Sequence, residues 1–166
     1  NLEFANLTGA NLRNIDLKTN YDMDDAMTKI IMITARTSHV KKINKFLEEG
    51  YIVLCDRFLY STIVYQGWLN KIDKYLDLHD DFCYGLYPDK VIFLDGDDDV
   101  IYNRIIKRNR QKDNYDFEKE KAYKINKDYR KIYSCFKAIN KFKDTIKLVN
   151  VNREILEVQE EILKLI

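Results

Sequence analysis

The chain has 166 residues, of which 46% are hydrophobic and 33% charged, and its formal net charge is +1. This length and composition fit one soluble globular domain, and the balanced charge gives no overall field that would attract nucleic acid or an anionic membrane. No apolar run approaches the ~18 residues of a membrane span, and no signal peptide opens the chain. The three cysteines are widely spaced, which argues against a disulfide framework or a structural zinc site and favours a reducing compartment, the cytoplasm.

Residues 1–20 contain an internal repeat of period five. Leu2, Leu7, Leu12 and Leu17 are each preceded by Asn or Asp. A period of five fits neither a helix nor a strand, and the pattern resembles the pentapeptide-repeat family, whose chain winds as a square β-helix. Because a single coil cannot bury its own inward face, we interpret the segment as a remnant or as the end of an array. The alternative is a short polar segment with a chance period.

The rest of the chain alternates between helical and strand patterns. Helical spacing is predicted over 26–49, 61–69, 72–78, 97–110, 117–142 and 154–166, and short apolar runs predict strands over 51–55, 90–94 and 145–149. Such nearly continuous apolar strands are typical of a parallel sheet that is buried on both faces. The alternation therefore predicts a second domain, residues 26–166, with an α/β fold and a parallel sheet flanked by helices.

Two polar residues that follow the first predicted strand carry the main chemical signal. Asp56 and Arg57 come directly after the strand, and ligands of open parallel sheets bind beyond the carboxyl ends of strands. A carboxylate at that edge can hold a hydrated Mg²⁺ near transferring phosphates, and a guanidinium fork matches a phosphate monoester. Tyr65 and Gln66 follow about one helix later, where a ring and an amide could bind a nucleobase or a sugar. The alternative is a buried strand followed by a solvated Asp–Arg pair.

The sequence around this pair resembles the thymidylate kinase family. That family has a strand ending in D-R-[YH], then S-[ST] and A-Y-Q-G, and this chain has Asp56-Arg57-Phe58, Ser61-Thr62 and Val64-Tyr65-Gln66-Gly67. Residues 35–40 are similar to the family's A-[DN]-R-x-x-H, residues 87–95 to its P-D-x-x-x-x-L-D strand, and residues 104–108 to the start of its lid. The resemblance covers about 26–166 and implies a fold like that of the P-loop nucleoside monophosphate kinases.

The resemblance implies a set of residues that bind the phosphoryl acceptor, dTMP. Arg57 would bind the phosphate of dTMP, and Arg36 would hydrogen-bond to the thymine ring. Tyr65 would lie against the deoxyribose, where a ribose 2′-hydroxyl would clash. The remaining members of this substrate-binding set are Ser61, Thr62 and Gln66.

The resemblance also implies residues that act on the transferring phosphoryl group. Asp56 would lie near the phosphates of Mg²⁺–ATP and contact the metal indirectly. The arginines Arg104, Arg108 and Arg110 would close over the phosphoryl group and offset its charge. The cofactor is then Mg²⁺ and the donor ATP, and the family's usual homodimer is compatible with apolar faces on the predicted helices. Nucleic acid is not an expected partner.

This chain departs from the family pattern at its beginning. The family starts with a strand and a phosphate-binding loop, G-x-x-x-x-G-K-[ST], but Gly9 is the only glycine before Gly50. The first strand would lie between 51–55 and 90–94, so its absence leaves two apolar strands with unpaired edges. We expect the five-residue repeat to be a poor substitute, because its chain turns a corner every five residues. The sheet then closes in another order, is marginally stable, or is completed by an upstream segment.

Two main hypotheses follow for the function. The first is a kinase of the thymidylate kinase type, transferring a phosphoryl group from ATP to dTMP to give dTDP, with an acceptor site but no donor loop in this chain, which makes its own activity doubtful. The second is a non-catalytic product of gene fusion or decay, either a pseudokinase or a pentapeptide-repeat interaction protein. A deoxynucleoside kinase is a weaker alternative, against which Tyr65-Gln66-Gly67 argues.

Overall fold

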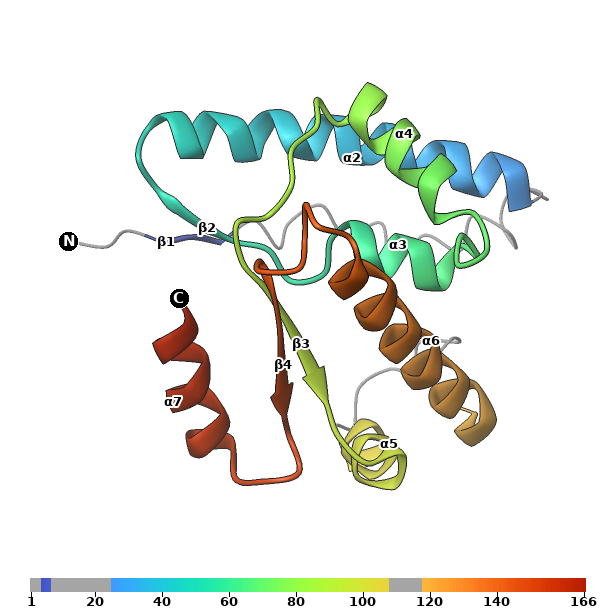
Figure 1. Cartoon of the computed structure of the whole chain (residues 1–166), viewed down its shortest axis with the longest axis vertical. Helices are drawn as coiled ribbons and strands as arrows, with labels where there is room; N and C mark the ends of the chain where they lie inside the picture. Colours follow the sequence, from blue (N-terminus) through green and yellow to red (C-terminus); the bar gives the residue numbers. More distant parts are fainter. Residues whose placement is uncertain (1–3, 7–24, 108–117) are drawn as a thin grey trace. The chain divides into compact units, whose positions relative to one another are not determined.

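A computed structural model describes residues 4–6, 25–107 and 118–166 of the chain (Figure 1). The chain divides into two compact units, Asn1–Tyr87 and Pro88–Ile166. In each unit the strands are parallel, as the alternation of helices and strands predicts, which confirms the α/β class. No helix in the described ranges is both long and apolar enough to cross a membrane.

The described residues of the first unit form one short parallel ladder and three helices. Its elements are β1 (Phe4–Asn6), α2 (Asp25–Glu48), β2 (Ile52–Leu54), α3 (Leu59–Tyr65) and α4 (Ile72–Phe82). In the ladder, Phe4 pairs with Ile52 and Asn6 pairs with Leu54. Helix α2 packs against β2 and α4, and α3 also packs against α4. This unit carries every predicted dTMP-binding residue.

Helix α2 ends at a glycine, as the sequence predicts. Gly50 has a φ of 85°, in the left-handed region that glycine adopts without steric cost. The Gly50 N–H donates to the carbonyl of Leu47, and the Tyr51 N–H donates to that of Phe46. These two bonds form a Schellman motif, and the edge-to-face contact of the Phe46 and Tyr51 rings supplies its usual apolar contact. The motif directs the chain from α2 into β2.

The core of the first unit lies directly after the Asp56–Arg57 pair. Phe58, Leu59 and Tyr60 are buried, whereas Asp56 and Arg57 are exposed. Tyr75 and His79 of α4 are among the largest fully buried side chains, and the Phe58 ring makes an edge contact with the His79 ring. The chain therefore enters the core at residue 58, which leaves the two polar side chains at its edge.

The second unit is a two-stranded parallel ladder covered on both faces. Its elements are β3 (Val91–Asp95), α5 (Asp98–Lys107), α6 (Lys119–Ala138), β4 (Ile146–Asn150) and α7 (Ile155–Leu165). The Phe93 ring contacts Tyr129 and Tyr133 of α6, whereas the neighbouring Ile92 packs into a cluster with Val158 of α7. Because successive residues of a strand point to opposite faces, α6 and α7 cover opposite sides of the ladder (Figure 1).

Several expectations about the elements are wrong in detail. The helix predicted over 61–69 is Leu59–Tyr65, and the helix predicted over 72–78 continues to Phe82. The helix predicted over 117–142 ends at Ala138, because Ile139 has extended backbone and the Phe142 ring packs back onto Phe136. The expectation that the repeat-like segment is a poor substitute for a strand is contradicted in part, because Phe4–Asn6 form β1 and pair with β2. In the described part of the chain, the strands form two two-stranded ladders, β1–β2 and β3–β4, and which of the three expected ways completes the sheet stays a prediction. The remaining residues of the repeat, 7–20, lie outside the described residues.

Gly96 is required where the turn after β3 meets the turn after β4. A Cβ at Gly96 would lie 2.7 Å from Asn152 Oδ1 and 2.8 Å from Val151 Cγ2, closer than real contacts allow. We expect Gly96→Ala to lower the free energy of unfolding by about 1–3 kcal/mol, measured by urea denaturation. Unchanged stability of Gly96→Ala would contradict this account of Gly96.

Candidate functional site

The turn that follows β2 has a strained backbone. Arg57 has a φ of 62°, in the left-handed region that residues other than glycine seldom adopt. The Cys55 thiol donates to the Arg57 carbonyl at 3.3 Å, and burial raises the pKa of this thiol, which keeps it protonated as a donor. Strained residues of this kind cluster at ligand sites, where the surrounding structure holds them in place. The turn therefore holds Arg57 at the carboxyl end of a parallel strand.

The Arg57 side chain stacks on an aromatic ring from α3. The centre of its guanidinium lies 5.0 Å from the centroid of the Tyr65 ring. Such a contact is worth about 0.5–1 kcal/mol at an exposed site. It restrains the guanidinium while its N–H donors remain in the plane of the group, pointing away from the ring face. The two residues that the sequence assigns to phosphate and sugar thus lie together.

Arg36 of α2 is held by two residues of the segment that follows Arg57. Its guanidinium centre lies 4.9 Å from the centroid of the Phe58 ring, and its Nη2 donates to Thr62 Oγ1. Thr62 is only 3% exposed. Because Thr62 is buried and already bonded to Arg36, its hydroxyl can orient the guanidinium. The structure thus brings Arg36 and Thr62 into direct contact, although 26 positions separate them in sequence.

Two nitrogens near this contact are buried without a hydrogen-bond partner among the described residues, Arg36 Nε and His39 Nε2. An unmade hydrogen bond in a buried place costs about 1–3 kcal/mol, and ordered water or a ligand commonly satisfies such atoms. Burial, with the nearby positive charges of Arg36 and Lys42, lowers the pKa of His39. The imidazole therefore stays neutral at pH 7, and adds no second positive charge beside Arg36.

The other predicted substrate-binding residues belong to α3 and its end. Ser61 and Gln66 are half-buried, and the Gln66 N–H caps the helix by donating to the Thr62 carbonyl at 2.9 Å. Thr62, Tyr65 and Gln66 are three and four residues apart, a spacing that places them on one side of a helix. The predicted set therefore comes from three neighbouring pieces of the first unit: α2, the turn after β2, and α3.

The predicted lid arginines belong to the second unit. Arg104 lies in α5, and its Nη2 donates to the backbone carbonyl of Arg153 at 3.3 Å. Arg108 and Arg110 lie outside the described residues. The assignment of these three arginines to a lid stays a prediction.

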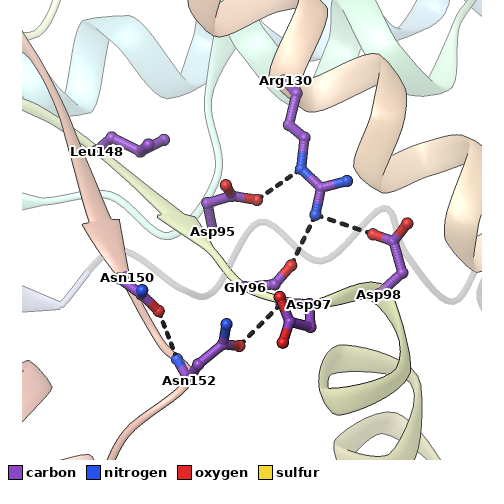
Figure 2. A pocket seen from close by; sticks show the side chains of 8 residues that line it. All are labelled: Asp95, Gly96, Asp97, Asp98, Arg130, Leu148, Asn150 and Asn152. Atoms are coloured by element: carbon purple, nitrogen blue, oxygen red, sulfur yellow. Dashed lines mark hydrogen bonds and ion pairs between the residues drawn. The ribbon is translucent and has the colours of Figure 1, made fainter.

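A cleft of about 490 Å³ opens at the carboxyl ends of β3 and β4. It is lined by Asp95, Gly96, Asp97, Asp98, Arg130, Leu148, Asn150 and Asn152 (Figure 2). No motif of the sequence marks this cleft, although the rule that ligands bind at carboxyl ends of strands applies to these strands too. Asp95 and Asn150 are the last residues of the two strands and pair in the ladder. Polar residues at these two strand ends are the sequence signal from which the cleft could be predicted.

Several hydrogen-bond acceptors that line the cleft contact one positively charged side chain, that of Arg130. Arg130 of α6 forms ion pairs with Asp95 at 2.8 Å and with Asp98 at 2.9 Å. These carboxylates raise the pKa of Arg130, which is charged at any physiological pH. One guanidinium balances the charge of only one carboxylate, so the cleft, whose lining includes three aspartates and one arginine, keeps a net negative formal charge.

The comparisons with known proteins all point to one family. A family model described as thymidylate kinase matches residues 5–162. The thymidylate kinase of Staphylococcus epidermidis is 40% identical over 134 residues, which are 77% of this chain and 64% of that protein. The thymidylate kinase of Rickettsia africae is 38% identical over 138 residues, 80% of this chain and 64% of that protein. This chain thus spans slightly less than two thirds of the length of these relatives.

A solved structure supports the fold. The crystal structure of thymidylate kinase from Ehrlichia chaffeensis matches with a TM-score of 0.63, at 23% identity, over 99% of this chain and 80% of that one. The match of the family model begins at residue 5, inside the segment with the five-residue period. The interpretation of residues 1–20 as a pentapeptide-repeat remnant stays a prediction.

Proposed function

The chain belongs to the thymidylate kinase family, and on that premise we propose that its first unit binds dTMP as the acceptor for phosphoryl transfer from ATP, giving dTDP. The observation that carries the proposal is the pair of restrained guanidinium groups, Arg57 on the Tyr65 ring and Arg36 on Thr62 and Phe58. The guanidinium of Arg57 suits the phosphate of a nucleotide, and that of Arg36 suits a hydrogen-bond acceptor on its base.

Arg57 is assigned to the acceptor phosphate. Its guanidinium can form two parallel bonds to phosphate oxygens, and the exposed turn leaves room for a dianion. Tyr65, which restrains this guanidinium, also offers a ring face against the deoxyribose. Phosphoryl transfer depends on positioning more than on covalent chemistry of the protein, so a fixed acceptor phosphate is the main contribution of this unit.

Arg36 is assigned to the base, together with Gln66 and Thr62. Thymine carries an acceptor at O4, where cytosine carries an amine donor. A guanidinium has only donors, so a bond from Arg36 favours thymine and leaves a donor facing a donor with cytosine. The hydroxyl of Thr62 supports this discrimination by holding the guanidinium in one orientation.

Asp56 fits the role of an indirect magnesium ligand. It is exposed at the carboxyl end of β2, and Mg²⁺ in phosphoryl-transfer sites keeps several waters and uses only one or two carboxylates. When bound, the ion would neutralise the charge that develops on the phosphates. Arg104, Arg108 and Arg110 are proposed to add positive charge around the same group.

A second candidate function is nucleotide binding without catalysis. It is favoured by one observation, namely that these 166 residues contain no G-x-x-x-x-G-K-[ST] sequence. The backbone N–H groups and the lysine of such a loop hold the phosphates of ATP, and without them we expect slow transfer at most. A homodimer is proposed for either function.

Calorimetric titration with dTMP, with dCMP as the control, tests the acceptor site. We expect dTMP to bind roughly tenfold or more tightly than dCMP, because one matched base contact is worth about 1–3 kcal/mol. Equal affinity for both nucleotides would refute the assignment of Arg36, and no heat from either, in a chain shown to be folded, would refute the acceptor site. An assay of dTDP formation from ATP then separates the two functions, because the non-catalytic candidate binds dTMP without producing dTDP.

A further inference from the structure

The turn from β3 into α5 is held by one side chain of α6. Arg130 donates from Nε to Asp95 Oδ1 at 2.8 Å, and from Nη2 to the Gly96 carbonyl at 2.6 Å. The same Nη2 lies 2.9 Å from Asp98 Oδ1 (Figure 2). One guanidinium thus bridges the last residue of β3, the middle of the turn and the first residue of α5.

The charges of this turn require such a partner. Asp95, Asp97 and Asp98 place three carboxylates within four residues, and Asp99 follows them. The side chains of Arg130, Asp95 and Asp98 are 39%, 32% and 31% exposed. Water and salt screen partly buried charges less than fully exposed ones. The guanidinium of Arg130 therefore offsets repulsion between the carboxylates that solvent alone would not remove.

The remainder of the same α6 face contacts the start of α5. Asn126 donates to Asp98 at 3.3 Å, Tyr123 donates to Asp99, and Lys119 forms an ion pair with Asp99 at 3.0 Å. Residues 119, 123, 126 and 130 recur at helical spacing, so they form one stripe along α6. Arg130 extends these contacts beyond α5 to the turn and to the end of β3.

The position of α5 matters for the proposed reaction. Arg104 lies on this helix, and residues 108–117, which contain the other predicted lid arginines, follow its end. Because α5 begins at Asp98, a rotation of its first turn would move the rest of the helix and displace Arg104. A displacement of 1 Å in a positioning group can lower a rate by about a hundredfold.

We propose that Arg130 is a positioning residue for phosphoryl transfer, because it fixes the turn from which the helix carrying Arg104 begins. This inference rests on the proposed function, although Arg130 itself touches neither the acceptor nor the donor. A lysine at this position would keep the charge but not the fork, which holds two carboxylates and a carbonyl at once.

The test compares Arg130→Gln with Arg130→Lys and with Lys127→Gln, a control that removes the same charge from an exposed position of α6. Hydrogen exchange is measured at the amides of 97–101. In Arg130→Gln we expect this exchange to be on the order of tenfold faster, because the variant loses the charged hydrogen bonds that hold the turn. Arg130→Lys should be intermediate, Lys127→Gln should match the wild type, and the amides of β3 and β4 should exchange at the wild-type rate in every variant.

Activity provides the second measurement. In Arg130→Gln we expect kcat for dTDP formation to fall roughly tenfold or more, while the affinity for dTMP stays within about twofold. Unchanged exchange at 97–101, or faster exchange with unchanged kcat, would overturn the inference. Faster exchange throughout α6 and the strands would also overturn it, since Arg130 would then only stabilise the unit. Failure of the proposed function is distinguishable, because it appears in the wild-type chain as absent dTMP binding or as absent dTDP formation.

Discussion

Arg57→Gln is expected to abolish measurable dTMP binding while the chain remains folded. The substitution removes the charge at the turn after β2 and keeps a side chain of moderate length. Removing one partner of a hydrogen-bonded charge pair costs about 2–5 kcal/mol, which corresponds to a loss of affinity of roughly 30-fold to several-thousand-fold. Calorimetric titration with dTMP gives the affinity, and circular dichroism gives the fold.

Two further variants separate binding from stability at this position. Arg57→Gly should also lose dTMP binding, yet it should be as stable as the wild type or more so, because glycine adopts a φ of 62° without strain. Lys41→Gln removes a positive charge from an exposed position of α2 and should bind dTMP as the wild type does. Retention of affinity within twofold in Arg57→Gln would exclude Arg57 as the phosphate ligand.

Arg36→Met is expected to remove the preference for dTMP over dCMP. Methionine keeps the apolar contact with Phe58 but has no donor for the base. The affinity for dTMP should fall roughly tenfold or more, whereas the affinity for dCMP should change little, because Arg57 still binds the phosphate common to both. Titrations of one variant with the two nucleotides measure the ratio directly.

Thr62→Val refines this prediction. Valine has the shape of threonine without its hydroxyl, so the variant removes the bond that orients Arg36 while leaving Arg36 in place. The preference for dTMP should fall in the same direction but by less than in Arg36→Met. If dTMP and dCMP lose affinity equally in both variants, Arg36 contributes general electrostatics and does not distinguish the bases.

Part of this site could be predicted from the sequence because its signals are local. A short apolar strand followed by Asp56 and Arg57 places both residues at a carboxyl edge, and Gly50 marks the end of the preceding helix. The contacts that restrain the guanidinium groups are not local in this sense. Thr62 lies 26 positions from Arg36, and nothing in the sequence indicates that its hydroxyl is turned toward that arginine.

The contacts of Arg130 are the clearest example of a feature that could not be predicted from the sequence. Arg130 lies in a helix rich in lysine and tyrosine, where another cation is typical of a solvated surface. Its partner Asp95 lies 35 positions away, and only the packing of α6 on the β3–β4 ladder brings the two together. The sequence predicts too long a helix α6 for a related reason. Ile139 and Phe142 continue its apolar pattern, but the helix ends at Ala138.

The joining of the turns after β3 and β4 bears on the order in which the second unit folds. The Asp97 N–H donates to Asn152 Oδ1 at 2.8 Å across 55 positions of sequence, and the Val151 N–H donates to the Asp95 carbonyl at 2.7 Å. Contacts this distant require a large loop to close, and that entropy is lost before the bonds can form. β3 and β4 pair across the same 55 positions, so the same loop closure forms the ladder and the cleft edge, and neither has to precede the other.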